Sequence, residues 1–354
     1  MRKTTTTALL TFFILSLVLT YPLALHLPGG VEDRQDALLN VWITAWDGHQ
    51  LLEDPLHLFD ANIFHPYPRT LAYSELLLGN ALLALPLTAI TGNPVFGYNV
   101  ALLLSFFLSG FGAYLLVLRL TRSWGAGLVA GTIFAFSAYR LTNLAQAQLL
   151  ITQWLPLALV ALYSLMRRPS LRSVAIFGLF FCLQALSSFY YAILLALAVV
   201  GFVAWEVGAW IVARLAPGRS TAGSAPAGPL RRPPFRHLGL AALFCGLLIL
   251  PFALAYFQVQ GDLGFERSLA DNEPFSASLR QYAMVPPNSL LYKGWLPSDD
   301  TPIAGGYPVD ALFPGLVTVL LAGWGLVRGR GTRRWFFFLL AITALVLSLG
   351  PRLY

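Results

Sequence analysis

The sequence is poor in charge and in cysteine. Only 11% of its 354 residues are charged and 57% are hydrophobic, whereas charged residues make up about a quarter of a soluble domain. This shortage excludes an ordinary soluble globular protein, and the mean hydropathy of +0.68 indicates that lipid is the solvent for much of the chain. The two cysteines, Cys182 and Cys245, lie inside apolar stretches, which excludes a disulfide framework and is typical of small packing residues.

Long apolar stretches take the place of the missing charge. They predict nine transmembrane helices, because a helix needs about 20 apolar residues to cross a bilayer. The first follows Arg2 and Lys3 and has no small-residue cleavage site after it, so we interpret it as a retained helix and not as a signal peptide. The approximate ranges are 8–25, 95–118, 125–139, 149–166, 172–187, 189–213, 238–257, 311–327 and 334–350.

One further apolar stretch, residues 75–91, is short, contains Pro86 and ends in a turn-like Gly-Asn-Pro sequence. If it lies in the interface or re-enters the membrane, most of the 23 basic residues fall on one side. All of the 16 acidic residues then fall on the other side, except Glu206, which lies inside a span. A full span would move the later basic clusters to the outside, against the positive-inside rule. We therefore expect nine spans, with the N-terminus in the cytoplasm and the C-terminus outside.

These features predict an all-α fold: a polytopic membrane protein of about nine transmembrane helices, with an extracytoplasmic first loop that contains interfacial helices and a re-entrant stretch. The net charge of +7 does not indicate a nucleic-acid partner, because Lys and Arg sit in short clusters between apolar stretches and not on one soluble face. We interpret these clusters as signals of topology. The sequence shows no internal repeat of useful length.

Composition divides the chain into three parts. Residues 1–213 form an N-terminal transmembrane module that includes the first outside loop, 26–75, and the interfacial or re-entrant stretch. Residues 214–237 form a Pro-, Gly- and Arg-rich linker without acids, which we expect to be flexible and to lie against anionic lipid in the cytoplasm. Residues 238–354 form a C-terminal transmembrane module, whose outside loop, 258–310, is a candidate lid.

The first outside loop contains a stretch with helical periodicity that begins at Asp36, a residue type favoured at helix N-caps. At about 100° per residue, the polar and apolar side chains separate onto two faces. The polar face holds Asp36, Asn40, Thr44 and Asp47, and the apolar face holds Leu38, Leu39, Trp42 and Trp46. We expect an interfacial helix with its tryptophans at the headgroup level and its polar face toward an aqueous cavity.

Two aspartates near the beginning of this loop are candidates for a general base. Asp33 and Asp36 follow the outer end of the first span, where the polar head of a membrane-embedded substrate would arrive. A carboxylate there can accept a proton from an attacking hydroxyl. We rank Asp36 ahead of Asp33. The structural alternative is a helix cap without chemistry for Asp36 and a solvated loop charge for Asp33.

The rest of the loop contains a rigid turn, three histidines and two more aspartates. Pro66 and Pro68 bracket Tyr67 and fix an irregular turn. The histidines and aspartates match no recognised metal-ligand spacing, so we interpret them as surface and turn residues and predict no metal site. They are His49, His57, His65, Asp54 and Asp60.

Three segments carry a recognisable pattern: residues 36–46 (DALLNVWITAW), 62–86 (NIFHPYPRTLAYSELLLGNALLALP) and 136–157 (FSAYRLTNLAQAQLLITQWLPL). They resemble bacterial membrane proteins of the GT-C glycosyltransferase superfamily, of the protein-mannosyltransferase-like type. The resemblance covers most of the chain. It implies an enzyme of the cell envelope, located in the bacterial plasma membrane, that uses polyprenyl-phosphate-linked sugars. In that superfamily the first outside loop carries the essential acid, and interfacial helices follow before the second span.

The resemblance implies inverting transfer of a hexose or pentose from polyprenyl phosphate to a hydroxyl of a glycan, lipid or protein acceptor. The essential acid matches Asp36 best and Asp33 second, and Glu75 matches a second acid. Because the leaving phosphate is already an anion, the reaction needs a base and cations and no strong general acid. No cofactor is certain from the sequence, and a divalent cation, Mg²⁺ or Mn²⁺, is left open.

Basic residues that face outward are candidates for holding the leaving phosphate. Arg140 ranks first, because it lies where the third span leaves the membrane and precedes a glutamine-rich polar run. The alternative is an arginine whose charged head snorkels to the interface. Arg69, Arg280 and Lys293 come next. The side chains expected to line the substrate cavity are Asn40, Asp47, His65, Tyr67 and Gln148.

Two other functions compete with the transferase. A lipid-linked-saccharide flippase or another membrane transporter would show internal symmetry and polar residues through the bilayer centre, and neither is evident in the sequence. Glu206 lies near the inner end of its predicted span, which favours snorkelling or pairing with a nearby arginine over transport. A catalytically silent scaffold would not explain the acid-rich first loop.

Overall fold

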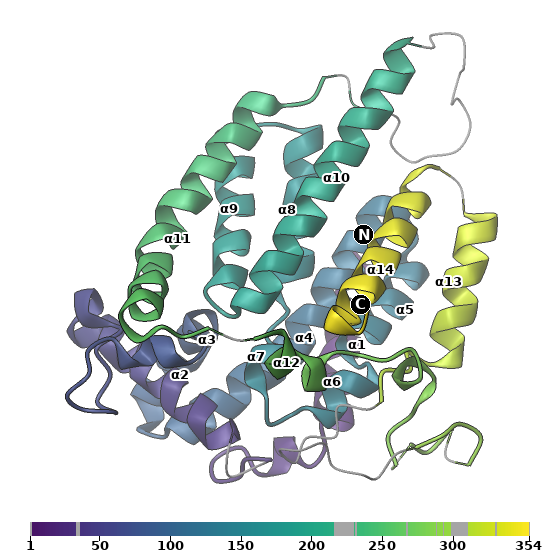
Figure 1. Ribbon diagram of the computed structural model, residues 1–354. Helices are drawn as coiled ribbons and strands as arrows, with labels where there is room; N and C mark the ends of the chain where they lie inside the picture. Colours follow the sequence, from purple (N-terminus) through teal and green to yellow (C-terminus); the bar gives the residue numbers. More distant parts are fainter. Residues whose placement is uncertain are drawn as a thin grey trace. The chain divides into compact units, whose positions relative to one another are not determined.

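The regular structure of the chain is helical. The computed structural model describes residues 2–32, 36–215, 230, 232–266, 268–287, 289–292, 294–298, 311–329 and 331–353. Within these ranges no β-strand is formed, so the all-α prediction is confirmed (Figure 1). The chain divides into two compact units: the first comprises the described residues of 1–136, 143–215 and 229–265, and the second those of 137–142 and 266–354.

The first unit contains most of the helices, and the short 3₁₀ turns among them are labelled η. Its elements are α1 (Arg2–Leu19), η1 (Leu23–Leu25), α2 (Asp36–Glu53), η2 (Pro55–His57), η3 (Thr70–Tyr73), α3 (Leu78–Thr91), α4 (Pro94–Thr121), α5 (Trp124–Ala135), α7 (Ala147–Leu150), α8 (Trp154–Arg167), α9 (Leu171–Ala185), α10 (Phe189–Leu215) and α11 (Phe235–Leu263). The linker predicted at 214–237 lies mostly outside the described residues. The helix that follows the linker, α11, packs on α9 within this unit.

The second unit is smaller. Its elements are α6 (Ala138–Thr142), α12 (Leu269–Asn272), η4 (Glu273–Phe275), η5 (Gln281–Ala283), α13 (Leu316–Arg328), α14 (Arg333–Ser348) and η6 (Gly350–Leu353). The segment around η5 is bonded to the end of α14: Ser348 O accepts the N–H of Ala277 at 2.8 Å, and its hydroxyl lies 2.7 Å from the Tyr282 hydroxyl. Residues 299–310 of the candidate lid lie outside the described ranges.

Four helical stretches in the described part of the chain are long and apolar enough to cross a membrane: Pro94–Thr121, Ala147–Arg167, Phe189–Leu215 and Phe235–Leu263. These helices indicate a membrane protein. Each of the nine predicted spans coincides with a helix, namely α1, α4, α5, α8, α9, α10, α11, α13 and α14. Four of them qualify as spans by length and composition, and the other five stay predictions.

Small residues let the first helices approach one another closely. The ring of Phe12 in α1 is fully buried, and it lies against the positions of Gly110 in α4 and Gly131 in α5. A methyl group on Gly131 would collide with the backbone of Gly110 and with this ring. Contacts between small residues are the usual basis of helix association in lipid, where the hydrophobic effect does not drive helices together.

The ambiguous stretch 75–91 forms α3, which has 14 residues. At about 1.5 Å per residue it reaches about 21 Å, which is short of the roughly 30 Å of a bilayer core. Gly92 ends the helix in a left-handed conformation with a φ of 67°, and Asn93 begins α4 by accepting the N–H of Phe96. The predicted turn is thus confirmed, while the interfacial or re-entrant position of α3 stays a prediction.

Figure 1 shows α8, α9, α10 and α11 side by side, with α2 and α3 near one end of them. At that end α8 and α10 begin and α9 and α11 finish. The opposite ends of the long helices carry arginines, namely Arg119, Arg167, Arg168, Arg172, Arg214 and Arg236. These helix-end arginines therefore gather at one end of the first unit, and which end faces the cytoplasm stays a prediction.

Candidate functional site

The polar face of α2 points into the first unit. Asn40, Thr44 and Asp47 are 4%, 3% and 0% exposed, whereas Leu38 and Leu39 on the opposite face are 44% and 43% exposed. The predicted division of this helix into two faces is confirmed. The expectation that the polar face points toward an aqueous cavity is wrong for these three side chains, because α3, α4 and α7 pack on α2 and bury them.

Asp36 is the first residue of α2 and is partly exposed. Its Oδ2 accepts a hydrogen bond from Nε2 of Gln146 at 3.3 Å. One turn along α2, the amide of Asn40 donates to the carbonyl of Ala145 and to Oε1 of Gln148, each at 3.1 Å. The structure thus brings together three residues that the sequence assigned to the site, Asp36, Asn40 and Gln148.

The position of these glutamines depends on a break between α7 and α8. Residues 151–153 leave the helical conformation, and backbone groups that water cannot reach must then find partners inside the protein. The carbonyls of Leu149, Leu150 and Ile151 accept hydrogen bonds from the side chains of Tyr191, Ser105 and Gln184, at 2.8, 2.7 and 2.8 Å. Side chains from α4, α9 and α10 therefore fix α7 beside α2.

Asp47 is completely buried, although the sequence predicts it in a substrate cavity. Neither carboxylate oxygen has a hydrogen-bond partner among the described residues. Burial raises the pKa of Asp47 to about 8, and the nearby backbone N–H of Leu77 partly opposes the rise. Thr44, on the same face of α2, receives the side-chain N–H of Asn80 at 3.3 Å. Asp47 therefore lies where α2 crosses the beginning of α3.

Glu75, the predicted second acid, precedes α3 and reaches the beginning of α10. Its Oε2 accepts the backbone N–H of Phe189, the first residue of α10, at 3.1 Å. Burial raises the pKa of Glu75 to about 7, and the backbone N–H of Phe189 and the nearby Ser188 side chain partly oppose the rise. A carboxylate at a helix N-terminus satisfies a backbone donor that has no partner within the helix. Glu75 thus has a structural role as a cap from a distant segment.

Tyr256 of α11 is a residue of this region that sequence reasoning missed. Its hydroxyl donates to the carbonyl of Ser74 at 2.9 Å, and its ring packs at 78° against Phe189 with 4.8 Å between centroids. It interacts electrostatically with both Glu75 and Asp47. A tyrosine in an apolar helix gives no specific signal in a sequence, apart from the need of its hydroxyl for a partner when it is buried.

The loop between α2 and α3 holds Arg69 at its surface. This residue has a left-handed backbone with a φ of 55°, and its N–H donates to Oδ1 of Asp60 at 2.9 Å. Its guanidinium lies 3.8 Å from Oδ2 of Asp262 in an exposed ion pair. His65 and Tyr67, predicted to line the cavity, are exposed in the same loop. The side chain of Arg69 is thus engaged in a pair that the sequence did not predict.

The other predicted phosphate ligands belong elsewhere. Arg140 and Arg280 are part of the second unit. Arg140 is 5% exposed, and its backbone N–H bonds to Ser137 O at 3.0 Å, whereas Arg280 is exposed. Lys293 and the candidate base Asp33 lie outside the described residues. Roles in phosphate binding or catalysis for these four residues stay predictions.

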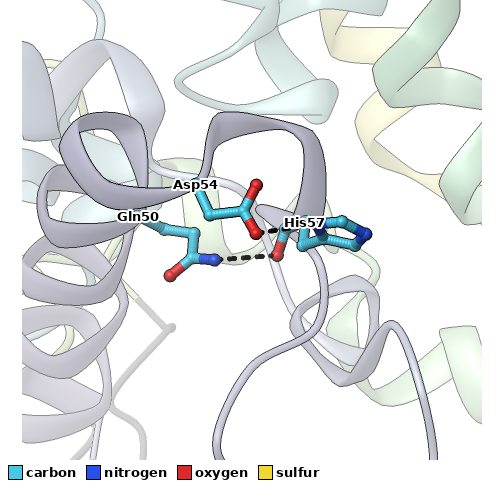
Figure 2. A network of polar contacts seen from close by, with 3 residues as sticks. All are labelled: Gln50, Asp54 and His57. Atoms are coloured by element: carbon cyan, nitrogen blue, oxygen red, sulfur yellow. Dashed lines mark hydrogen bonds and ion pairs between the residues drawn. The ribbon is translucent and has the colours of Figure 1, made fainter.

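A second group of polar side chains lies on the surface just after the buried part of α2 (Figure 2). Nδ1 of His57 is 2.8 Å from Oδ2 of Asp54, and the amide of Gln50 donates to the carbonyl of His57 at 3.3 Å. The side chains of His57 and Asp54 are 62% and 50% exposed, so the prediction of surface residues is confirmed for both. Among the residues that the structure describes, no three His, Cys, Asp or Glu side chains group as a metal site.

Glu206 of α10 is paired with an arginine, which is one of the two alternatives to transport that the sequence favours. Its Oε2 accepts a hydrogen bond from Arg167 of α8 at 3.0 Å, and its side chain is 4% exposed. The guanidinium of Arg167 also lies 5.6 Å above the ring of Tyr163. Pairing with an arginine at the end of a neighbouring helix compensates the buried charge. The residue is therefore explained without a transport role.

Comparisons of the chain with protein-family models, with curated proteins and with solved structures found no match.

Proposed function

We propose that this chain is an integral-membrane glycosyltransferase that moves a sugar from a polyprenyl-phosphate donor to an acceptor hydroxyl at the extracytoplasmic face. The proposal depends on the sequence resemblance of the first outside loop and on one observation. Asp36 offers a partly exposed carboxylate, oriented by Gln146, at the first residue of a helix whose polar face continues into the protein. A base that accepts a proton must be both accessible and held in place.

In the proposed reaction Asp36 removes the proton of the acceptor hydroxyl as its oxygen attacks the anomeric carbon. The bond between that carbon and the phosphate oxygen breaks on the opposite face, and the electron pair leaves with polyprenyl phosphate. The configuration of the sugar is inverted, and Asp36 later returns its proton to water. General-base assistance of this kind contributes about 10² to 10⁴ in rate.

The leaving phosphate needs positive charge, because charge builds on its bridging oxygen as the bond breaks. We assign this role to Arg140 first, since a guanidinium can hold a phosphate through two parallel hydrogen bonds. Arg280 and Lys293 follow, and Arg69 ranks last because it would have to leave Asp262. The acceptor, whether glycan, lipid or protein, is not specified by these residues.

A lipid-linked-saccharide flippase or another transporter is the second candidate. The observation that favours it is Asp47, a buried ionisable side chain without a hydrogen-bond partner among the described residues. Buried ionisable groups in membrane proteins often mark the path of an ion or substrate. This support is weaker than that for the transferase, because such a group also fits a purely structural role.

One experiment separates the two functions. The purified full chain is reconstituted in liposomes with a panel of polyprenyl-phosphate-linked sugars, and released polyprenyl phosphate is measured together with the sidedness of the intact donor. A transferase releases the lipid phosphate from at least one donor when an acceptor is present. Movement of intact donor across the bilayer without any release would support the transporter and contradict the transferase.

A further inference from the structure

Asp47 presents a problem of charge in the folded protein. Its side chain is 0% exposed, and moving an ionised carboxylate from water into such a place without a partner is very costly. Neither oxygen has a hydrogen-bond partner among the described residues, and Asp47 belongs to none of the ion pairs between them. Something must therefore neutralise this carboxyl group.

Two donors of this region bond to acceptors other than Asp47. The hydroxyl of Tyr256, which lies within electrostatic range of Asp47, donates to the carbonyl of Ser74. The side-chain amide of Asn80 donates to the hydroxyl of Thr44 at 3.3 Å. The backbone N–H of Leu77 lies close to the Asp47 carboxyl, and it does not form a hydrogen bond of ordinary geometry.

One acceptor on α3 also lacks a hydrogen-bond donor. Oδ1 of Asn80 is buried and lacks a hydrogen-bond partner within the described part of the chain. Thr44 and Asp47 are three residues apart on α2, so their side chains are neighbours on one face. Asn80 contacts Thr44 and lies one turn after Leu77 on α3. Two unpaired acceptors, Asp47 and Asn80, therefore flank the same crossing, and a single proton between them would satisfy both.

We propose that Asp47 is a proton-binding site: in the folded protein it is a neutral carboxylic acid that donates a hydrogen bond to Oδ1 of Asn80 and so joins α2 to α3. Loss of this proton places an uncompensated charge at the crossing and loosens the beginning of α3. The segment just before α3 carries Glu75, which caps α10. The change therefore extends to the end of the bundle where Asp36 lies. The inference does not depend on the proposed transferase activity.

The titratable groups around this site are few. Of the elements that pack on α2, α3 and α7 carry none, α4 contributes Tyr98 near its beginning, and η2 contributes the exposed His57. Glu75 and Tyr256 come from the segment before α3 and from α11, and His49 of α2 itself is exposed. None of these groups is a lysine or arginine, so a proton is the simplest neutralising charge. It also needs no room for coordinating ligands, unlike a metal ion.

Infrared spectroscopy of the full chain in detergent micelles tests the proposal directly. The C=O band of protonated carboxylic acids is recorded near neutral pH for the wild type, Asp47→Asn, Glu75→Gln and the exposed control Asp54→Asn. We expect the band of Asp47→Asn to lack one component that the bands of Glu75→Gln and Asp54→Asn retain. In Asn80→Ala the same component moves to higher frequency, because the acid has lost its hydrogen-bond acceptor.

Thermal unfolding supplies an independent readout. The pKa of Asp47 is about 8 when folded, against 3.8 for the exposed group. The stabilisation by its proton is therefore complete below about pH 4 and lost as the pH rises through about 8. The melting temperature of Asp47→Asn relative to wild type should rise across this range and then level off. The corresponding difference for Asp54→Asn should show no such rise.

Three results would overturn the proposal. The acid band of Asp47→Asn could match that of the wild type, which would show that Asp47 is ionised and accepts a hydrogen bond from a reoriented Asn80 amide. The melting difference could be independent of pH. Sodium or magnesium chloride, but not choline chloride, could stabilise the wild type and not Asp47→Asn, which would assign the neutralising charge to a metal ion. If Asp47→Asn does not fold, the band shift in Asn80→Ala decides alone.

Discussion

Two carboxylates near the same helix, Asp47 and Asp54, lie two turns apart in sequence and meet opposite surroundings. Asp47 is sealed at the crossing of α2 and α3 without a hydrogen-bond partner among the described residues, whereas Asp54 is half exposed and paired with His57. A carboxylate in water keeps its charge at little cost, and a buried one must be paired or protonated. Burial in the tertiary structure, and not proximity in sequence, thus decides what an acid can do here.

The same contrast separates two ion pairs among the described residues of the first unit that involve arginine. Arg167 and Glu206 are largely buried, with side chains 19% and 4% exposed, while Arg69 and Asp262 are 39% and 72% exposed. Exposed pairs contribute about 0 to 1 kcal/mol, and removal of one partner from a buried pair costs several times more. Buried polar groups should therefore control stability, and exposed ones should hardly affect it.

The largest expected effect on stability follows from breaking the buried pair. Arg167→Gln leaves Glu206 without its cation, and we expect a loss of about 3 to 5 kcal/mol in unfolding free energy. The measurement is unfolding in mixed detergent micelles, with Arg69→Gln as the exposed control. The double variant Arg167→Gln, Glu206→Gln should recover much of the loss. Equal effects of Arg167→Gln and Arg69→Gln would contradict the difference in stability between buried and exposed pairs.

Glu75 should contribute a pH dependence of intermediate size. Its pKa is raised from 4.5 to about 7, so its proton stabilises the fold fully below about pH 4.5, and this contribution is lost as the pH rises through about 7. Relative to wild type, Glu75→Gln should gain about 3 kcal/mol of stability across this interval. Unfolding of both proteins at a series of pH values measures the difference. A constant difference would mean that the cap on Phe189 holds Glu75 ionised throughout.

Gln146 should affect rate more than folding. Its hydrogen bond to Asp36 involves a charged acceptor, and such bonds are worth about 1.5 to 3 kcal/mol. We expect Gln146→Leu to lower transfer about tenfold to a hundredfold, with little change in the apparent affinity for the donor. Kinetics with a reactive polyprenyl-phosphate sugar supply the test, and Gln146→Glu should not restore the rate, because it places a second carboxylate beside the base.

The smallest effect is expected at the exposed end of α2. Asp54→Asn removes a surface pair with His57, and we expect a change of less than about 1 kcal/mol that is weakened further by salt. Thermal unfolding at low and high ionic strength checks this expectation. A loss as large as that of Arg167→Gln would show that exposure does not separate the two classes of polar group.

Periodicity predicted the helices and the faces of α2 well, because both depend on residues close in sequence. The polar side chains Asn40, Thr44 and Asp47 were assigned to one face, and they share it in the structure. What covers that face could not be predicted in the same way. It depends on α3 and α7. Gln146 and Gln148, just before and within α7, approach α2 only because a break in the backbone is held by side chains from three other helices.

The roles of Glu75 and Tyr256 show the same limit. Glu75 caps a helix that begins more than a hundred residues later, and Tyr256 reaches Ser74 from α11. Neither contact leaves a local pattern, since each joins segments that only the tertiary structure brings together. Charge distribution, by contrast, anticipated the clusters of arginine at the helix ends, because it counts clusters over the whole chain.

The direct measurement of the central claim is transfer of a labelled sugar from polyprenyl phosphate by wild type, Asp36→Asn and Asp54→Asn, each shown to be folded by its melting temperature. If Asp36 is the base, wild type and Asp54→Asn label the acceptor at similar rates, and Asp36→Asn is slower by about 10² to 10⁴. Equal rates for Asp36→Asn and wild type would contradict the role of Asp36 as the base.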